Sequence, residues 1–181
     1  IVYGRKQLRM VRGGPGTGKT LSMLVRAQKV LEWRHLPVLV LCKTNTLVGI
    51  NRKRLLSSFR NGKSVVGDDV ERKIHVMTLA RYLCSVFYNN NGCWFSDEDV
   101  SVPGMRRRNC NVCMGNRVQE ILSGAYEIPQ HSQLISYGAV LVDEAQVMTT
   151  DELQAVYLLT GRGNPWRDFY IFCRIIRFIV L

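Results

Sequence analysis

Eight residues near the start of the chain have the types and spacing of a phosphate-binding loop. They read Gly-Gly-Pro-Gly-Thr-Gly-Lys-Thr over positions 13–20 and satisfy the pattern G-x-x-x-x-G-K-S/T. Glycine lets the backbone adopt positive φ, so that its N–H groups can turn inward around an anion. The predicted phosphate-binding residues are Gly13, Gly14, Pro15, Gly16, Thr17, Gly18, Lys19 and Thr20.

A helix-like segment follows this loop directly, which strengthens the prediction. The free N–H groups and the positive end of the helix dipole would face the same phosphates. Lys19 would neutralise charge on the β- and γ-phosphates, and the Thr20 hydroxyl would be a magnesium ligand. The alternative is a glycine-rich turn before a helix, which the preceding strand-like run makes much less favoured. The sequence therefore predicts a nucleoside-triphosphate site that uses Mg²⁺.

A second segment supplies the acids that such a site needs. Residues 137–144 read Tyr-Gly-Ala-Val-Leu-Val-Asp-Glu, an apolar strand that ends in two carboxylates. At the carboxyl end of a parallel strand, Asp143 can reach a magnesium ion held by Thr20 and the phosphates. Glu144 can orient or deprotonate a water aimed at the γ-phosphate. An acid pair at a helix start would look similar, but the upstream loop favours the metal-site interpretation.

Alternating apolar runs and helical patterns predict the elements that position these residues. The fold class is α/β, a P-loop domain with a mostly parallel central sheet flanked by helices. The predicted strands cover residues 7–11, 37–42, 73–78, 137–142 and 169–173. The predicted helices cover residues 19–33, 46–59, 79–87 and 151–159. The last of these helices should begin with a capping box formed by Thr149 and Glu152.

The regular pattern breaks between residues 89 and 116, which are rich in turn formers and charge. We expect an insertion or a long surface loop there. Cys110 and Cys113, with Cys93 nearby, could hold zinc, although free thiols are favoured because zinc usually needs four ligands. The arginine run at 106–108 could grip phosphates, but such a run is more often simply solvated.

The bulk composition suits a single domain over residues 1–181 that can bury a core. The chain carries 25 Lys and Arg against 14 Asp and Glu, a formal net charge of +11. Such a field attracts polyanions, among which nucleic acid is common, although many basic proteins never bind it. No apolar stretch approaches the roughly 20 residues of a membrane span, so we expect no membrane partner. A cytosolic P-loop protein normally keeps its thiols reduced, so we interpret most of the six cysteines as ordinary buried residues and expect a cytoplasmic location.

The order of motifs in this chain resembles that of the superfamily 1 helicases of the UvrD-like group, in their first RecA-like ATPase domain. The segments are GGPGTGKT, PVLVLCKTNTLV, VMTLARYL and VLVDEAQ. The resemblance implies a helicase or translocase that couples ATP hydrolysis to movement on single-stranded DNA or RNA. It implies catalytic roles for Lys19, Glu144 and Gln146, with Gln146 sensing the γ-phosphate.

The same resemblance implies that Thr44, Asn45 and Thr78 contact the backbone of a single nucleic-acid strand. Two of these positions match the group's motif after the second strand, and Thr78 matches the motif after the third. The alternative is that all three residues cap helices that follow strands, which Thr and Asn do routinely.

The resemblance stops at the end of the strand predicted over 169–173. The group has an acid and a glutamine there, whereas this chain continues with Arg174 and an apolar run to residue 181. We interpret this as a truncation rather than a divergent strand that closes the sheet. A second RecA-like domain, which supplies an arginine finger, is then missing from this chain. We therefore expect ATP binding, at most weak hydrolysis and no unwinding by the isolated chain.

Two other functions remain open from the sequence. One is a P-loop nucleotide switch or small-molecule kinase, but the chain lacks an N-K-x-D guanine motif, and such kinases normally lack an Asp-Glu pair followed by Gln. The other is a catalytically inert remnant whose basic surface merely binds nucleic acid.

Overall fold

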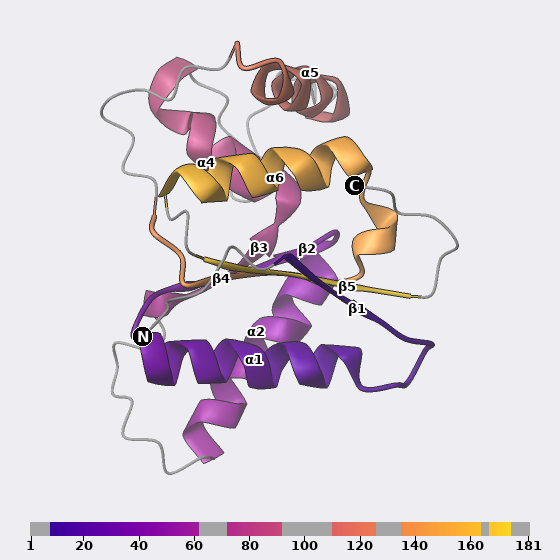
Figure 1. The fold of residues 1–181 in the computed structure, drawn as a ribbon, viewed down its shortest axis with the longest axis vertical. Coiled ribbons are helices and arrows are strands. Elements are labelled where there is room, and N and C mark those ends of the chain that lie inside the picture. Colours follow the sequence, from indigo (N-terminus) through magenta and orange to yellow (C-terminus); the bar gives the residue numbers. More distant parts are fainter. Residues whose placement is uncertain (1–7, 62–71, 92–109, 126–134, 164–166, 175–181) are drawn as a thin grey trace, which may run out of the picture.

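The fold is a three-layer sandwich in which one parallel sheet lies between two layers of helices (Figure 1). The computed structural model describes residues 8–61, 72–91, 110–125, 135–163 and 167–174. In spatial order the strands are β1 (Leu8–Arg12), β5 (Asp168–Cys173), β4 (Ala139–Val142), β2 (Val38–Cys42) and β3 (Ile74–Thr78). Each neighbouring pair is parallel, so the predicted α/β fold with its parallel sheet is confirmed.

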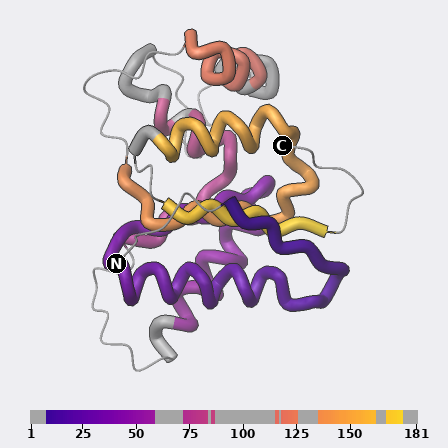
Figure 2. Tube along the Cα trace, viewed as in Figure 1, coloured from indigo at the N-terminus to yellow at the C-terminus, as the bar shows by residue number. Residues whose placement is uncertain are grey.

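Helices cover both faces of the sheet. The helices are α1 (Lys19–Arg34), α2 (Asn45–Asn61), α4 (Leu79–Asn91), α5 (Cys110–Leu122) and α6 (Thr150–Gly163), with a short 3-10 helix η2 (Ala145–Val147). In Figure 1, α1 and α2 lie below the sheet, α4 and α6 lie above it, and α5 packs outside α6. Figure 2 shows that β1 and β5, from opposite ends of the described chain, lie side by side.

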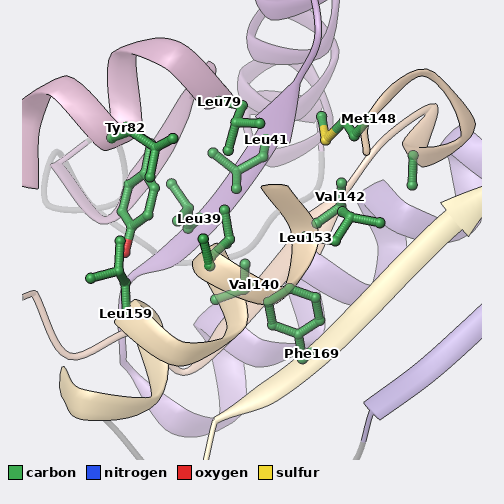
Figure 3. Close-up of a cluster of buried hydrophobic side chains, with 14 of the residues drawn as sticks. Leu39, Leu41, Leu79, Tyr82, Val140, Val142, Met148, Leu153, Leu159 and Phe169 are labelled. Carbon is green, nitrogen blue, oxygen red and sulfur yellow. The ribbon is translucent and has the colours of Figure 1, made fainter. Parts of the chain in front are cut away.

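The three inner strands are buried on both sides, which explains their continuous apolar sequences. Successive side chains of a strand point to opposite faces. Leu39, Leu41 and Phe169 therefore join the cluster under α4 and α6, drawn in Figure 3. Val40 and Leu141 join the cluster against α1 and α2. The outer strands β1 and β3 are only partly buried, as expected at the sheet edges.

The prediction of a loop over residues 89–116 is wrong at both ends of the segment. Helix α4 continues to Asn91, and α5 already begins at Cys110. The apolar residues that anchor α5 are Val118 and Ile121, which lie beyond the segment and pack in the cluster with α6. The helix extends backward from this anchor through a stretch with little apolar periodicity, which is why sequence reasoning missed it.

The zinc and phosphate hypotheses for this segment stay predictions. Cys93 and the arginines at 106–108 lie outside the described residues, and so do the side chains of Cys110 and Cys113. In the part of the chain that the structure describes, no three His, Cys, Asp or Glu side chains form a metal-binding group. Among the described helices, none has the length and apolarity needed to cross a membrane.

The capping box that opens α6 is confirmed. The Thr149 backbone N–H donates to Glu152 Oε2 at 2.8 Å, and the Glu152 N–H donates to Thr149 Oγ1 at 3.2 Å. This reciprocal pair satisfies two helix-start donors that would otherwise lack partners. Lys43 Nζ, from the end of β2, lies 3.5 Å from Glu152 Oε1 and ties the helix start to the sheet.

Replacing Thr149 with alanine should therefore lower the free energy of unfolding by about 0.5–2 kcal/mol. The Thr149→Ala change removes the acceptor of the Glu152 N–H and leaves the backbone unchanged. Urea unfolding followed by circular dichroism measures the loss. Thr150→Ala, one residue later and exposed, is the matched control and should change stability by less than about 0.5 kcal/mol. Equal losses from both variants would contradict the capping role.

Candidate nucleotide-binding site

The predicted site residues gather at one edge of the sheet. Because all the described strands are parallel, their carboxyl ends meet at this edge. The loop at 13–20 follows β1, the Asp143–Glu144 pair follows β4, and Arg174 follows β5. Two backbone hydrogen bonds bind the strand ends together. The Gly13 N–H donates to the Cys173 carbonyl at 3.3 Å, and the Asp143 N–H donates to the Leu41 carbonyl at 2.9 Å.

The loop has the backbone geometry that its glycines predict. Gly16 and Gly18 have φ of 72° and 80°, in the left-handed region that other residues rarely adopt. A Cβ on Gly13 would lie 2.4 Å from Thr17 Oγ1, so a larger residue there would displace the Thr17 side chain. Thr17 Oγ1 itself donates to the Gly14 carbonyl at 2.9 Å. Backbone conformation and close packing therefore both require glycine in this loop.

Lys19 places its positive charge directly on this loop. Its Nζ donates to the Gly13 carbonyl at 2.8 Å and to the Gly14 carbonyl at 2.7 Å. Helix α1 starts at Lys19 after Gly18, which provides no side-chain cap, and the first helical turn contains no acid. The Ser22 N–H donates to the Gly18 carbonyl at 2.8 Å, and the N–H groups that precede it in that turn are left for an external acceptor. A phosphate group fits this combination of uncapped donors and a nearby ammonium group.

Asp143 is a buried carboxylate with two polar partners. Its side chain is 3% exposed, its Oδ2 accepts a hydrogen bond from Asn51 Nδ2 at 2.9 Å, and its Oδ1 accepts the Glu144 N–H at 3.1 Å. Burial raises the pKa of Asp143, and the negative charge of Glu144 raises it further. The Asn51 hydrogen bond and the positive charge of Lys19 oppose this rise. The ionised carboxylate therefore has too little positive charge around it to offset its burial. A divalent cation would supply that charge.

Glu144 has a strained backbone at the point where β4 ends. Its φ of 51° and ψ of 43° are left-handed, which costs a non-glycine residue on the order of 1–3 kcal/mol. Gln146 Nε2 donates to Glu144 Oε2, and Arg174 Nε lies 3.5 Å from the same oxygen. Gln146 Oε1 also accepts the Arg174 backbone N–H at 3.0 Å. Gln146 therefore joins the predicted catalytic acid to the end of β5.

The three residues predicted to contact nucleic acid lie at the ends of β2 and β3. Thr44 Oγ1 accepts the Leu47 N–H at 3.3 Å at the start of α2, where Asn45 is exposed. Thr78 Oγ1 accepts the Arg81 N–H at 3.2 Å at the start of α4. Both threonines thus do cap helices, as the alternative interpretation expected. A hydroxyl that accepts one hydrogen bond can still donate another, so capping does not remove them as phosphate donors.

Sequence reasoning missed two residues of this site, Asn51 and Arg174. Asn51 lies on the apolar stripe of α2 between Leu47 and Leu55, and a polar residue on such a stripe is a visible signal. Arg174 directly follows a buried strand, and the residue after a parallel strand lies at the ligand edge of the sheet.

The fold and the site together define an α/β domain with a five-stranded parallel sheet flanked by helices. In this sheet β5 lies between β1, which leads into the glycine loop, and β4, which ends at the acidic pair. No protein-family model matches the sequence, and no curated protein matches it. Among solved structures, the chain is similar to the NS3-like helicase from Alongshan virus, with 13% sequence identity and a TM-score of 0.43. The match covers 92% of this chain and 32% of that one, so this chain spans about a third of that helicase's length.

Proposed function

We propose that this chain is the ATP-binding domain of a nucleic-acid-dependent helicase or translocase of the superfamily 1 type. The observation that carries the proposal is the convergence of the 13–20 loop, Asp143, Glu144 and Gln146 at one sheet edge. The backbone N–H groups of the loop and the first turn of α1 would bind the phosphates. Lys19 would exchange its two carbonyl partners for oxygens of the β- and γ-phosphates.

Thr20 and Asp143 would hold Mg²⁺, which would neutralise phosphate charge during ATP hydrolysis. Thr20 lies in the first turn of α1, and Asp143 is the buried carboxylate at the end of β4. Glu144 would orient or deprotonate the attacking water. Gln146 forms hydrogen bonds with both Glu144 and Arg174. It would therefore couple the presence of the γ-phosphate to the end of β5. The chain's own residues thus divide into phosphate holders, metal ligands and a water-activating acid.

A single strand of DNA or RNA is the proposed partner. Thr44 and Asn45 are exposed at the same sheet edge, and Thr78 lies there too. The net charge of +11 favours a polyanion, and Arg52, Lys53 and Arg54 on α2 are exposed. The ATP affinity of a small-molecule kinase or a switch should not change when a single strand is added. An inert remnant would bind the strand without regard to ATP.

The test is a titration of fluorescent ATP with Mg²⁺ into the purified chain, with and without a single-stranded oligonucleotide. We expect the oligonucleotide to tighten ATP binding by about 5–150-fold, the usual range of coupling between two sites. Because this coupling is reciprocal, ATP should tighten oligonucleotide binding by the same factor. ATP binding that ignores the oligonucleotide would contradict the motor function and favour the kinase or switch.

Thr44→Ala tests whether the predicted contact carries this coupling. It should reduce the oligonucleotide effect while leaving ATP affinity in its absence unchanged. Ser57→Ala is the control, because Ser57 is an exposed hydroxyl residue on α2, the helix that Thr44 caps, and among the described contacts its hydroxyl bonds only the Arg54 carbonyl. Equal coupling in both variants would remove Thr44 from the interface.

A further inference from the structure

The buried amide of Asn51 is a polar group that the mechanism above does not use. Asn51 is 1% exposed, and it lies on the inner face of α2, whose apolar neighbours include Leu47, Val48 and Leu55. Burying an amide in such a setting costs free energy unless it forms hydrogen bonds. Its Nδ2 has two partners, Asp143 Oδ2 at 2.9 Å and Cys42 Sγ at 3.4 Å.

Asp143 is the stronger of these two partners. Burial raises the pKa of Cys42 to about 11, so its sulfur is a neutral thiol at pH 7 and only a weak acceptor. A hydrogen bond to a charged acceptor is roughly twice as strong as one between neutral groups. The second carboxylate oxygen, Oδ1, is bonded to the Glu144 N–H. The amide and this backbone N–H thus hold the carboxylate from two sides and fix its plane.

We propose that Asn51 is a positioning residue that holds the Asp143 carboxylate in the orientation required to bind magnesium beside the phosphates. This inference rests on the proposed function, because it assigns Asn51 a role at the same nucleotide site. Metal-binding carboxylates are commonly oriented by hydrogen bonds from outer partners. Without the amide, a buried carboxylate could rotate about its last bond and would lack one donor for its charge.

The position of Asn51 also connects this carboxylate to the far end of the candidate site. Helix α2 begins at Asn45, and Asn51 lies six residues further, about 9 Å along the axis at 1.5 Å per residue. Asp143 belongs to the end of β4, so the Asn51–Asp143 bond joins α2 directly to the metal-binding strand. The helix that starts at the predicted nucleic-acid contacts therefore also supplies the group that orients the metal ligand.

The test is the magnesium dependence of ATP binding, measured at equilibrium with fluorescent ATP in the full chain. Asn51→Leu preserves the size of the side chain and suits the apolar stripe, but it removes the donor to Asp143. We expect a rise of about 10–100-fold in the magnesium concentration that gives half of the maximal increase in ATP affinity. This is the usual loss when a residue that orients a metal ligand is removed. Magnesium-free ATP binding, measured in EDTA, should stay within about threefold, because the loop and Lys19 are unchanged. Asn51→Ala gives the same comparison if the leucine variant does not fold.

Two further variants separate positioning from general damage. Leu55→Val removes a methyl-sized group from a fully buried side chain one turn along α2, without touching Asp143, and should leave the magnesium midpoint unchanged. Asp143→Asn should raise the midpoint by itself, and adding Asn51→Leu to it should then have no further effect. An unchanged midpoint in Asn51→Leu, or effects that add in the double variant, would overturn the proposal. Failure of wild-type ATP binding would instead overturn the proposed function.

Discussion

Replacing Lys19 with alanine should weaken magnesium-dependent ATP binding by roughly 10–150-fold. The expected loss is that of a hydrogen bond to a charged group, about 1.5–3 kcal/mol. The structure already places Lys19 Nζ on the loop, 2.8 Å and 2.7 Å from the Gly13 and Gly14 carbonyls. Bound phosphate oxygens would take over as its acceptors, so the ammonium group need move little. Titration with fluorescent ATP measures the change.

Lys29→Ala is the matched control for this experiment. Lys29 lies on the same helix, is exposed, and its Nζ is 5.7 Å from the centre of the Trp33 ring. Its removal changes the net charge of the chain as much as Lys19→Ala does, but far from the loop. ATP affinity in Lys29→Ala should stay near that of the wild type. Equal affinities in wild type and Lys19→Ala would refute the phosphate site, and equal losses in both variants would indicate an effect of net charge alone.

The sheet itself was predictable because its inner strands are buried on both faces. The apolar runs at β2, β4 and β5 were located to within two residues, because strands buried on both faces are almost continuously apolar. The strand order was not predictable from these runs. The pairing of β1 with β5 joins residues near opposite ends of the described chain and depends on long-range contacts.

The candidate site likewise has residues that the sequence predicts and residues that it does not. The 13–20 loop was predictable because its function depends on local backbone conformation, which glycines at fixed spacing encode. Asp143 was predictable because it ends an apolar strand. The partners of these residues were harder to find, because the Asn51–Asp143 bond spans 92 positions and the Arg174–Gln146 bond spans 28. Such contacts depend on how α2 and β5 pack, which no local pattern records.

The failure at α5 has a related physical cause. The part of α5 before Val118 contains Gly115 and two asparagines, Asn111 and Asn116, which are weak helix formers. Packing of Val118 and Ile121 in the cluster with α6 supplies the stability that this local sequence lacks. Tertiary contacts therefore overrode propensity there, whereas in α1 the apolar period and the packing agree.

The position of β4 at the centre of the sheet leads to a large expected effect on stability. Leu141 is 0% exposed, and its Cα is in register with Val40 on one side and Tyr170 on the other. Leu141→Ala should lower the free energy of unfolding by about 2–5 kcal/mol, through lost burial and the cavity that remains. Urea unfolding measures this loss. Leu141 also lies close to the candidate site, because Asp143 follows it by two residues.

Leu158→Ala is the control of the same chemistry. Leu158 lies on α6 and is 39% exposed, so its truncation should change stability by about 0.5 kcal/mol or less. The contrast depends mainly on burial, since both variants remove the same atoms. Similar losses from the two variants would mean that β4 is not the buried centre of the sheet. The arrangement that brings Asp143 to the edge beside the glycine loop would then be wrong as well, because β4 carries that residue.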